Sequence, residues 1–279
     1  MSLITKIKSG LKSLALASAM GLACLSFSGK AEANVIPHLN ERLVSYYNFE
    51  GNTNDSQGTN HGINHGADYV NGKVGEGLYF NGVNDLVEIP EDNSLDLNHL
   101  SLSLWFNSDF QTAGHLINKG QSRNEDLSYR LYLVHLDSGT GDHVISGDNW
   151  TNENGRKWVD SPYLRNQWNH AAFTYDGDNE VLYLNGKEVD RVAQSGTTRT
   201  TDTSLFLGCR LFDSQTITHY EGLMDEVGIW DRALTPVEVG QLWNNGNGPL
   251  IPEPTGLVLL AGGAGALALR RRKKNEFNN

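Results

Sequence analysis

Short runs of alternating apolar and polar residues recur along the chain and predict an all-β fold. The clearest run, residues 100–106, alternates leucine with serine over its first five positions, as in an antiparallel strand with one face on a core. Many short β-rich runs separated by turn residues favour a two-sheet β-sandwich. The other runs lie at 43–49, 86–89, 129–135, 143–145, 204–208 and 222–230.

A hairpin is the most clearly predicted pair of strands. Residues 168–175 and 181–184 are β-rich, and the segment 176–179 between them (Asp-Gly-Asp-Asn) has the composition of a turn. That segment also has the oxygen-rich composition of a cation loop, but the hairpin explains its residues. Asn185 and Gly186 follow the second strand, and Asn-Gly tolerates the positive φ of a type I′ turn, so another reversal is expected there.

One helix is predicted near the end of the β-rich region. Thr235 and Glu238 have the spacing of a capping box, and Pro236 stands at the first helical position. Gly246 is the expected C-terminal stop. Neither a repeat nor a second domain is visible in the sequence, so residues 34–248 are predicted to form one domain.

The N-terminal segment is typical of export. Residues 1–33 combine a lysine-bearing start, an apolar stretch at 14–27 and an Ala-x-Ala site that ends at Ala33, the pattern of a signal peptide. This leader predicts passage through the Sec translocon. Cys24 raises a lipoprotein signal as an alternative, but Gly21 stands where that signal has leucine.

A sorting segment is predicted at residues 249–279. An uncharged stretch (255–269) is followed by a basic run (270–274), and its 15 residues make a helix of about 22 Å, short of the ~30 Å hydrocarbon core. Before it comes a Pro-Glu-Pro motif, made of Pro252, Glu253 and Pro254. The three parts together resemble the PEP-CTERM signal of exopolysaccharide-producing Gram-negative bacteria. An ordinary tail anchor is the alternative.

The PEP-CTERM resemblance implies where the protein is located. It implies an exosortase-type peptidase as a partner and a chain anchored in the inner membrane by its C-terminal transmembrane segment until it is processed. The basic run would stay on the cytoplasmic side, which leaves the main domain outside. After processing, the protein would be at the cell surface, in the outer membrane or in the extracellular matrix.

The charge of the part between the two ends excludes some partners. It holds 13 of the 22 basic and 30 of the 33 acidic residues, a net charge of −17. Such a surface repels nucleic acid and anionic lipids, whereas a neutral sugar is indifferent to it. Cys209 is the one cysteine left, so no internal disulfide forms in this part. The sequence has neither zinc-ligand spacing nor a phosphate-binding glycine loop.

Four ordered segments resemble the LamG-like jelly-roll family of the concanavalin A-like lectin/glucanase superfamily. The resemblance covers roughly residues 42–246 and implies two antiparallel sheets packed face to face, in agreement with the strand pattern. The segments are 47–58 (YNFEGN followed by NDSQG), 75–90 (GEGLYFNG running into DLVEIP), 168–186 (WNHAAFTYDG with LYLNG) and 222–235 (GLMDEVGIW ending in RALT).

The LamG-like resemblance also implies a structural calcium ion, held by an early Asp-Ser-x-Gly loop and a late Asp-Glu pair. In this sequence the implied ligands are Asp55 and Asp225, with loop carbonyls near Thr59 and His61. Calcium prefers six to eight oxygen ligands, which a glycine-rich loop can supply. As alternatives, Asp55 forms only an Asx-turn and Asp225 is only an edge-strand charge.

The sequence does not support catalysis. Glucanases of the superfamily place carboxylates alternately on one strand (Glu-x-Asp-x-Glu), so that two of them face the same bond about 5.5 Å apart. Glu188 and Asp190 come nearest to this pattern, but the third carboxylate is missing. Asp225 and Glu226 are adjacent and would point to opposite faces of a strand. A Gly-x-Ser-x-Gly nucleophile motif is absent from the sequence as well.

A carbohydrate site is the favoured hypothesis, because residues 147–158 place Trp150 and Trp158 in a polar, loop-like setting. The alternative is that these two tryptophans only pack their loop against a sheet edge. The predicted function is an exported, non-catalytic binding module for carbohydrate or for the cell surface and its exopolysaccharide matrix. A structural biofilm protein without a glycan ligand is the alternative, and a divergent glycan-cleaving enzyme is the third. Arg210, Asp213 and His219, from a second loop-rich stretch, complete the candidate site, whereas the remaining tryptophans are expected in the core: Trp105, Trp168, Trp230 and Trp243.

Overall fold

The computed structural model describes residues 39–109, 113–121, 127–135, 143–212 and 216–248. The predicted leader with Ala33, the motif at 252–254 and the segments after it lie outside these residues, as does Asp213. The signal-peptide and sorting assignments therefore stay predictions. Of the helices in the described ranges, none is long and apolar enough to cross a membrane.

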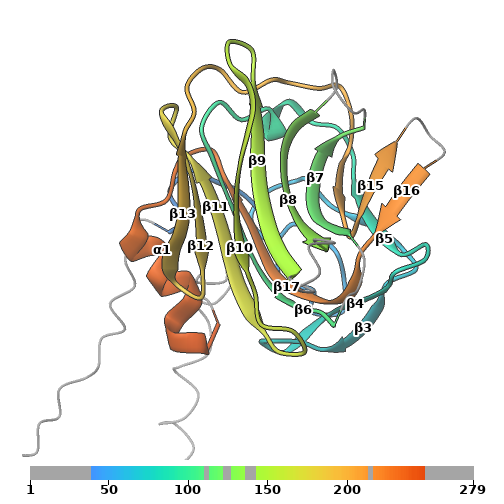
Figure 1. Ribbon diagram of the computed structural model, residues 1–279. Coiled ribbons are helices and arrows are strands. Elements are labelled where there is room, and N and C mark those ends of the chain that lie inside the picture. The colour runs from blue at the N-terminus through green and yellow to red at the C-terminus, as the bar shows by residue number, and fades with distance from the viewer. Residues whose placement is uncertain (1–38, 110–112, 122–126, 136–142, 213–215, 249–279) are drawn as a thin grey trace, which may run out of the picture. The chain divides into compact units, whose positions relative to one another are not determined.

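In the described part of the chain, eight strands form one antiparallel sheet. Its order is β13-β12-β11-β6-β17-β4-β3, and β1 pairs with β17 beside this path. The chain thus places its last strand between strands from its first half (Figure 1). The strands are β1 (Leu43–Tyr47), β3 (Asp68–Asn71), β4 (Glu76–Asn81), β6 (Leu100–Asn107), β11 (Asn169–Tyr175), β12 (Asn179–Leu184), β13 (Lys187–Ala193) and β17 (Glu221–Trp230).

A second antiparallel sheet contains seven of the described strands, in the order β10-β9-β8-β7-β14-β5-β2. A separate hairpin, β15 (Cys209–Phe212) and β16 (Thr216–His219), lies against β7 (Figure 1). The predicted two-sheet antiparallel sandwich is confirmed. The strands of this sheet are β2 (Ile63–His65), β5 (Leu86–Ile89), β7 (Gly114–Gly120), β8 (Leu127–His135), β9 (His143–Thr151), β10 (Gly155–Pro162) and β14 (Leu205–Leu207).

The strand with the clearest alternation, β6, turns its leucines into the core between the sheets. Leu102 is fully buried there, and burial of a leucine side chain stabilises a fold by about 1.5–3 kcal/mol. The serines point to the other face, where they are buried too. The Ser101 hydroxyl there donates to the Arg232 carbonyl at 2.8 Å and accepts from the Leu234 N–H at 2.8 Å. The expectation of a half-buried strand is therefore wrong, because later parts of the chain cover the second face.

One α-helix, α1 (Pro236–Trp243), lies in the described residues beside β13 (Figure 1). The capping box is confirmed, because the Glu238 N–H donates to the Thr235 hydroxyl and the Thr235 N–H donates to the Glu238 carboxylate. The predicted stop at Gly246 is wrong by two residues. The last helical residue is Trp243, and Asn244 caps the helix in a left-handed conformation (φ 47°). A 3₁₀ turn η2 (Asn244–Gly246) follows, and another, η1 (Asn93–Leu95), precedes β6.

Both predicted turns around β12 are confirmed. Asn185 and Gly186 have φ values of 51° and 76°, as a type I′ turn requires. In the turn before β12, the Asp176 carboxylate accepts the N–H groups of Asp178 and Asn179 at 2.9 and 2.7 Å. These two bonds stabilise the turn, so Asp176 has a structural role there.

The loop-like interpretation of residues 147–158 is wrong. The segment forms most of the β9–β10 hairpin, in a continuous register from Thr151↔Gly155 to Val144↔Pro162. Gly147 has a packing role on the strand, because a Cβ there would come within 2.4 Å of the Phe173 ring in the facing sheet. Both tryptophans therefore sit on strands.

Candidate ligand-binding face

The outer face of the seven-stranded sheet carries arginine and aromatic side chains on β8, β9 and β10. The register places Asp148 of β9 opposite Arg130 on one side and Trp158 on the other. Paired residues point to one side of a sheet, and every second residue of each strand joins them. The alternate residues, such as Tyr129 and Leu131, belong to the core. We define the arginine–aromatic face by Arg130, Tyr132, Asp148, Trp150, Arg156 and Trp158.

Asp148 is buried at the centre of this face and holds both arginines. Arg130 donates to the two carboxylate oxygens at 2.9 and 2.6 Å, and Nε of Arg156 donates to Oδ2 at 2.9 Å. Arg156 also donates from Nη2 to the Tyr132 hydroxyl at 2.8 Å. Such charge-assisted, bidentate bonds are strong and directional. Both guanidinium groups are therefore held in fixed positions by the protein itself.

The aromatic rings pack against these guanidinium groups. Cζ of Arg130 lies 4.8 Å from the centre of the Trp150 ring, and Cζ of Arg156 lies 5.1 Å from the same ring and 5.2 Å from the Trp158 ring. Each such cation–π contact contributes about 0.5–1 kcal/mol when exposed, and more when water is excluded. Burial, followed by the charge of Asp148, raises the pKa of Tyr132, so its hydroxyl stays protonated at neutral pH.

An open pocket of about 240 Å³ lies at one end of the face. It is smaller than the ~300–1,000 Å³ cavities that enclose small molecules, so a ligand would remain partly in solvent. Trp158, which is 55 % exposed, supplies its aromatic wall, and Arg156 supplies its positive charge. The other residues around the pocket are polar (Tyr132, Ser146 and Asp160) or apolar (Val134 and Val144). An exposed aromatic ring with hydrogen-bonding groups around it can hold a sugar ring.

The structure brings together two of the predicted ligand-binding residues, and they have different roles. Trp158 lines the pocket, whereas Trp150 is only 6 % exposed beneath the two arginines and supports them. Arg210 and His219 lie on the β15–β16 hairpin and do not line this pocket. His219 is buried, with its Nδ1 3.3 Å from the Asp85 carbonyl.

Sequence reasoning missed the arginines, Asp148 and Tyr132. The signal was present, because β8 alternates Arg130 and Tyr132 with core residues, and β10 alternates Arg156 and Trp158 in the same way. Period-two spacing puts each pair on one face of its strand. What the sequence did not show is which strands are neighbours, and therefore that the two pairs meet at Asp148.

Three of the four predicted calcium ligands share one loop. The buried Asp55 carboxylate accepts N–H groups from Tyr46 (2.9 Å), Gln57 (2.9 Å) and Asn60 (3.2 Å), and the Asp55 N–H donates to Nδ1 of His61 at 3.1 Å. The carbonyl of the exposed Thr59 accepts the His61 N–H at 2.9 Å. These contacts include the Asx-turn expected as the alternative, and they leave lone pairs on both carboxylate oxygens.

Asp225, the fourth predicted ligand, holds a different loop. Its carboxylate accepts the N–H groups of Lys73 (2.7 Å), Val74 (2.9 Å) and Glu226 (2.8 Å), and so braces the turn between β3 and β4. Burial raises the pKa of Asp225 to about 7, although these three bonds oppose the shift. Within the described ranges, no group of three His, Cys, Asp or Glu side chains gathers in a way that could hold a metal.

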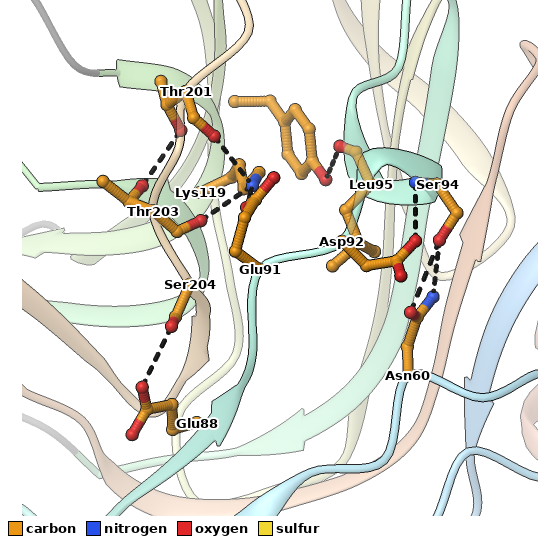
Figure 2. Close-up of polar contacts among 11 residues, drawn as sticks. Asn60, Glu88, Glu91, Asp92, Ser94, Leu95, Lys119, Thr201, Thr203 and Ser204 are labelled. Atoms are coloured by element: carbon orange, nitrogen blue, oxygen red, sulfur yellow. Dashed lines mark hydrogen bonds and ion pairs between the residues drawn. The ribbon is translucent and has the colours of Figure 1, made fainter.

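The buried ammonium group of Lys119 on β7 has all its partners within the protein (Figure 2). Its ammonium group contacts the Glu91 carboxylate and donates to the carbonyls of Thr201 at 3.1 Å and Thr203 at 2.7 Å. An ammonium group has three donors, and here each has an oxygen partner. The cluster therefore ties the segment before β14 to the end of β5 and offers nothing to a ligand.

The acidic residues closest to a glucanase pattern are engaged elsewhere. Glu188 forms a two-bond ion pair with Arg191 on the same strand, at 2.9 and 2.8 Å. Asp190 accepts the N–H of Asp160 at 2.9 Å. A retaining hydrolase needs two carboxyl groups converging on one bond, and this strand does not present them that way.

Many solved structures resemble this chain, and three of them illustrate the likeness. Domain 4 of AbnA, a GH43 extracellular arabinanase from Geobacillus stearothermophilus in complex with arabinotriose, is 24% identical with a TM-score of 0.56, over 72% of this chain and 98% of that one. The binding domain of Paraclostridial Mosquitocidal Protein 1 is 15% identical with a TM-score of 0.57, over 74% and 52%. The binding domain of Botulinum Neurotoxin DC in complex with SialylT is 11% identical with a TM-score of 0.56, over 75% and 52%.

At these identities the likeness shows the fold. The chain spans about half the length of the two toxin domains and nearly all of the arabinanase domain. No curated protein sequence matches the chain. The family model Laminin_G_3, described as the concanavalin A-like lectin/glucanases superfamily, matches residues 81–240.

Proposed function

The chain belongs to the concanavalin A-like lectin/glucanases superfamily, and on that basis we propose that it is an exported, non-catalytic module that binds glycan on the arginine–aromatic face. The observation that carries this proposal is the exposed Trp158 ring beside an arginine fixed by Asp148 and Tyr132. A sugar ring has an apolar face that can stack on an indole and a polar rim that needs directed donors. Because Arg156 is already held in place, binding would cost little side-chain entropy.

The related structures support an oligosaccharide as the ligand class. The arabinanase domain was solved in complex with arabinotriose and a neurotoxin binding domain in complex with SialylT. An open pocket of about 240 Å³ suits one residue of a chain that continues across the face. The negative charge of the domain favours a neutral glycan in general, whereas Arg156 gives the pocket itself a local positive charge.

A glycan array probed with the full chain tests this function. Hits are then measured by calorimetry with Trp158→Ala, and with Tyr79→Ala as the matched control, because Tyr79 is an exposed aromatic residue on the other sheet. We expect Trp158→Ala to lower affinity at least tenfold and Tyr79→Ala to leave it unchanged. Equal affinities for the two variants would show that the ligand lies elsewhere.

The same array separates the alternatives. A chain that binds no glycan but still accumulates in the matrix would be the structural biofilm protein, and release of products from polysaccharide would make it an enzyme. Export, exosortase processing and a final location at the cell surface or in the matrix belong to this proposal too. Mass spectrometry of the chain recovered from cells would test them by its termini, expected near Ala33 and Pro252.

Calcium at the Asp55 loop is also part of the proposal. The loop offers the Asp55 carboxylate and the Thr59 carbonyl oxygen, the kinds of oxygen that calcium prefers. Calcium added after chelation should raise the melting temperature, and Asp55→Ala should reduce that rise. An unchanged melting temperature in the unmutated protein would remove this site.

A further inference from the structure

A polar cluster lies between the two sheets, on the inner side of the strand that carries Trp150. Its members are Glu180 on β12, Asn149 on β9 and Gln194 just after β13. All three side chains are buried, Glu180 completely. A buried polar atom left without a partner costs about 1–3 kcal/mol, and more when it is charged. The function of this cluster therefore depends on which groups bind its buried oxygens.

The strand registers turn Glu180 and Asn149 into the same interior space. Glu180 lies opposite Tyr175 in one sheet, Asn149 lies opposite Tyr129 in the other, and both tyrosines belong to the core. The backbone N–H of Asn149 lies close to the Glu180 carboxylate, yet neither carboxylate oxygen accepts a hydrogen bond of good geometry from the described residues.

The orientation of the Gln194 amide is set by its donors. Nε2 donates to the Gly155 carbonyl at 2.9 Å and to the Thr151 hydroxyl at 3.2 Å. A carbonyl can only accept, so the nitrogen must be on this side of the amide. Thr151 follows Asn149 by two residues and so shares its face of β9. Oε1 of Gln194 is left as a buried acceptor without a partner among the described residues.

The Asn149 amide is fixed in the same way. Its Nδ2 donates to the Thr198 hydroxyl at 3.1 Å, and that hydroxyl donates its own proton to the Asn98 carbonyl at 3.0 Å. Thr198 can therefore only accept from Asn149, which rules out the flipped amide. Oδ1 of Asn149 becomes the fourth buried oxygen with no partner in the described part of the chain.

We propose that the two carboxylate oxygens of Glu180, with Oδ1 of Asn149 and Oε1 of Gln194, bind a calcium-sized divalent cation between the sheets. All four atoms are acceptors, so they cannot satisfy one another, and a proton on Glu180 would add a single donor. Hard divalent cations are bound by carboxylate and amide oxygens of this kind, with water completing six to eight ligands. Lys119 shows the opposite case, a buried charge that the protein neutralises by itself.

An access route for the ion adjoins the cluster. A polar pocket of about 350 Å³ lies where the β9–β10 hairpin meets β13, and Gln194 is part of its wall. The exposed Asp178 and Lys157 stand in the same wall, so the pocket has one charge of each sign and does not exclude a cation. The other residues around the pocket are Asn154, Ala193 and Ser195.

The bound ion would connect the two sheets behind the ligand-binding face. Asn149 lies on the hairpin that carries both tryptophans, whereas Glu180 lies on the opposite sheet. Loss of the ion would therefore loosen the hairpin at its inner side. This site is distinct from the Asp55 loop, and it does not depend on the glycan proposal.

Calcium binding to the chelator-treated full chain tests the site, measured by equilibrium dialysis and thermal unfolding. Glu180→Gln keeps the shape of the side chain and removes its charge. We expect it to bind one calcium ion fewer than the unmutated chain. In an Asp55→Ala background, calcium should still raise the melting temperature, and adding Glu180→Gln should abolish that rise. The control Glu153→Gln, an exposed acid on the same hairpin, should leave binding unchanged.

Equal calcium binding by the unmutated chain and Glu180→Gln would overturn the proposal. The buried oxygens would then be bound by a proton on Glu180 and by water. Asn149→Asp provides a second measurement if Glu180→Gln does not fold. A second carboxylate at a cation site should tighten calcium binding at least tenfold. At a site without an ion it would bring two buried acids together, calcium would not bind more tightly, and the proposal would fail.

Discussion

The outer faces of the two sheets carry aromatic side chains that are covered in different ways. On the eight-stranded sheet, Trp230 is buried in an apolar cluster with Val239 and Leu242 of α1, and its Nε1 donates to the Leu39 carbonyl at 2.6 Å. On the seven-stranded sheet, Trp150 is covered by guanidinium groups and Trp158 is open to solvent. One face is thus closed by the protein's own helix, and the other is organised by charge and remains accessible.

This difference shows how one fold divides stability from recognition. An apolar cover stabilises its face by excluding water, and it leaves no surface for a ligand. A cover of paired charges holds aromatic rings in place while keeping hydrogen-bond donors near solvent. We therefore expect mutations on the two faces to separate into effects on stability and effects on binding.

The largest loss of stability is expected at Asp148, the residue that holds both arginines of the arginine–aromatic face. Asp148→Ala leaves Arg130 buried without its counter-charge, which typically costs about 3–5 kcal/mol. Urea unfolding measures this loss, and glycan affinity should fall with it. Asp148→Asn keeps the shape and should cost less. A loss below about 1 kcal/mol for the alanine variant would mean that Arg130 finds another partner.

On the helix-covered face, Leu242→Ala should cost about 3 kcal/mol, because it leaves a cavity between α1 and the sheet. Glycan affinity, measured where the variant is still folded, should not change. Val237→Ala on the exposed side of the same helix is the control and should have little effect. A change in affinity for Leu242→Ala would contradict the separation of the two faces.

Acid should weaken the helix-covered face through His170. Burial lowers the pKa of His170 to about 3, below the ~6.5 of an unfolded chain. Between those values the unfolded chain takes up a proton and the folded chain does not, so this contribution is full above pH 6.5 and falls as the pH falls. The loss by pH 5 should be about 2 kcal/mol.

The unfolding free energy at pH 7 and at pH 5 checks the His170 prediction. His170→Gln should reduce the difference between the two values. His115, which lies on the other sheet, adds to the difference in both proteins, because burial lowers its pKa as well. An unchanged pH dependence in His170→Gln would refute the assignment.

The smallest effect on stability is expected at Trp158. Its ring is mostly exposed and makes one cation–π contact with Arg156, so Trp158→Ala should change the unfolding free energy by no more than about 1 kcal/mol. The same variant is expected to show the largest loss of glycan affinity on the open face. A destabilisation above 2 kcal/mol would instead make Trp158 a structural residue.

The sequence by itself determined the features that depend on neighbouring residues. The leucine–serine alternation of β6, the Asn185–Gly186 turn and the Thr235–Glu238 capping box are local patterns, and each appears in the structure where it was predicted. The ordered motifs were likewise enough to indicate a concanavalin A-like sandwich, which the family model supports.

Only the tertiary structure decided which surfaces these elements form. The meeting of Arg130, Asp148 and Arg156 depends on which strands are neighbours and in what register. The burial of Glu180 depends on the facing sheet, and the exposure of Trp158 depends on the absence of a cover over its end of the face in the described residues. Alternation along a strand defines two faces, but what each face contacts is set by segments far away in the chain.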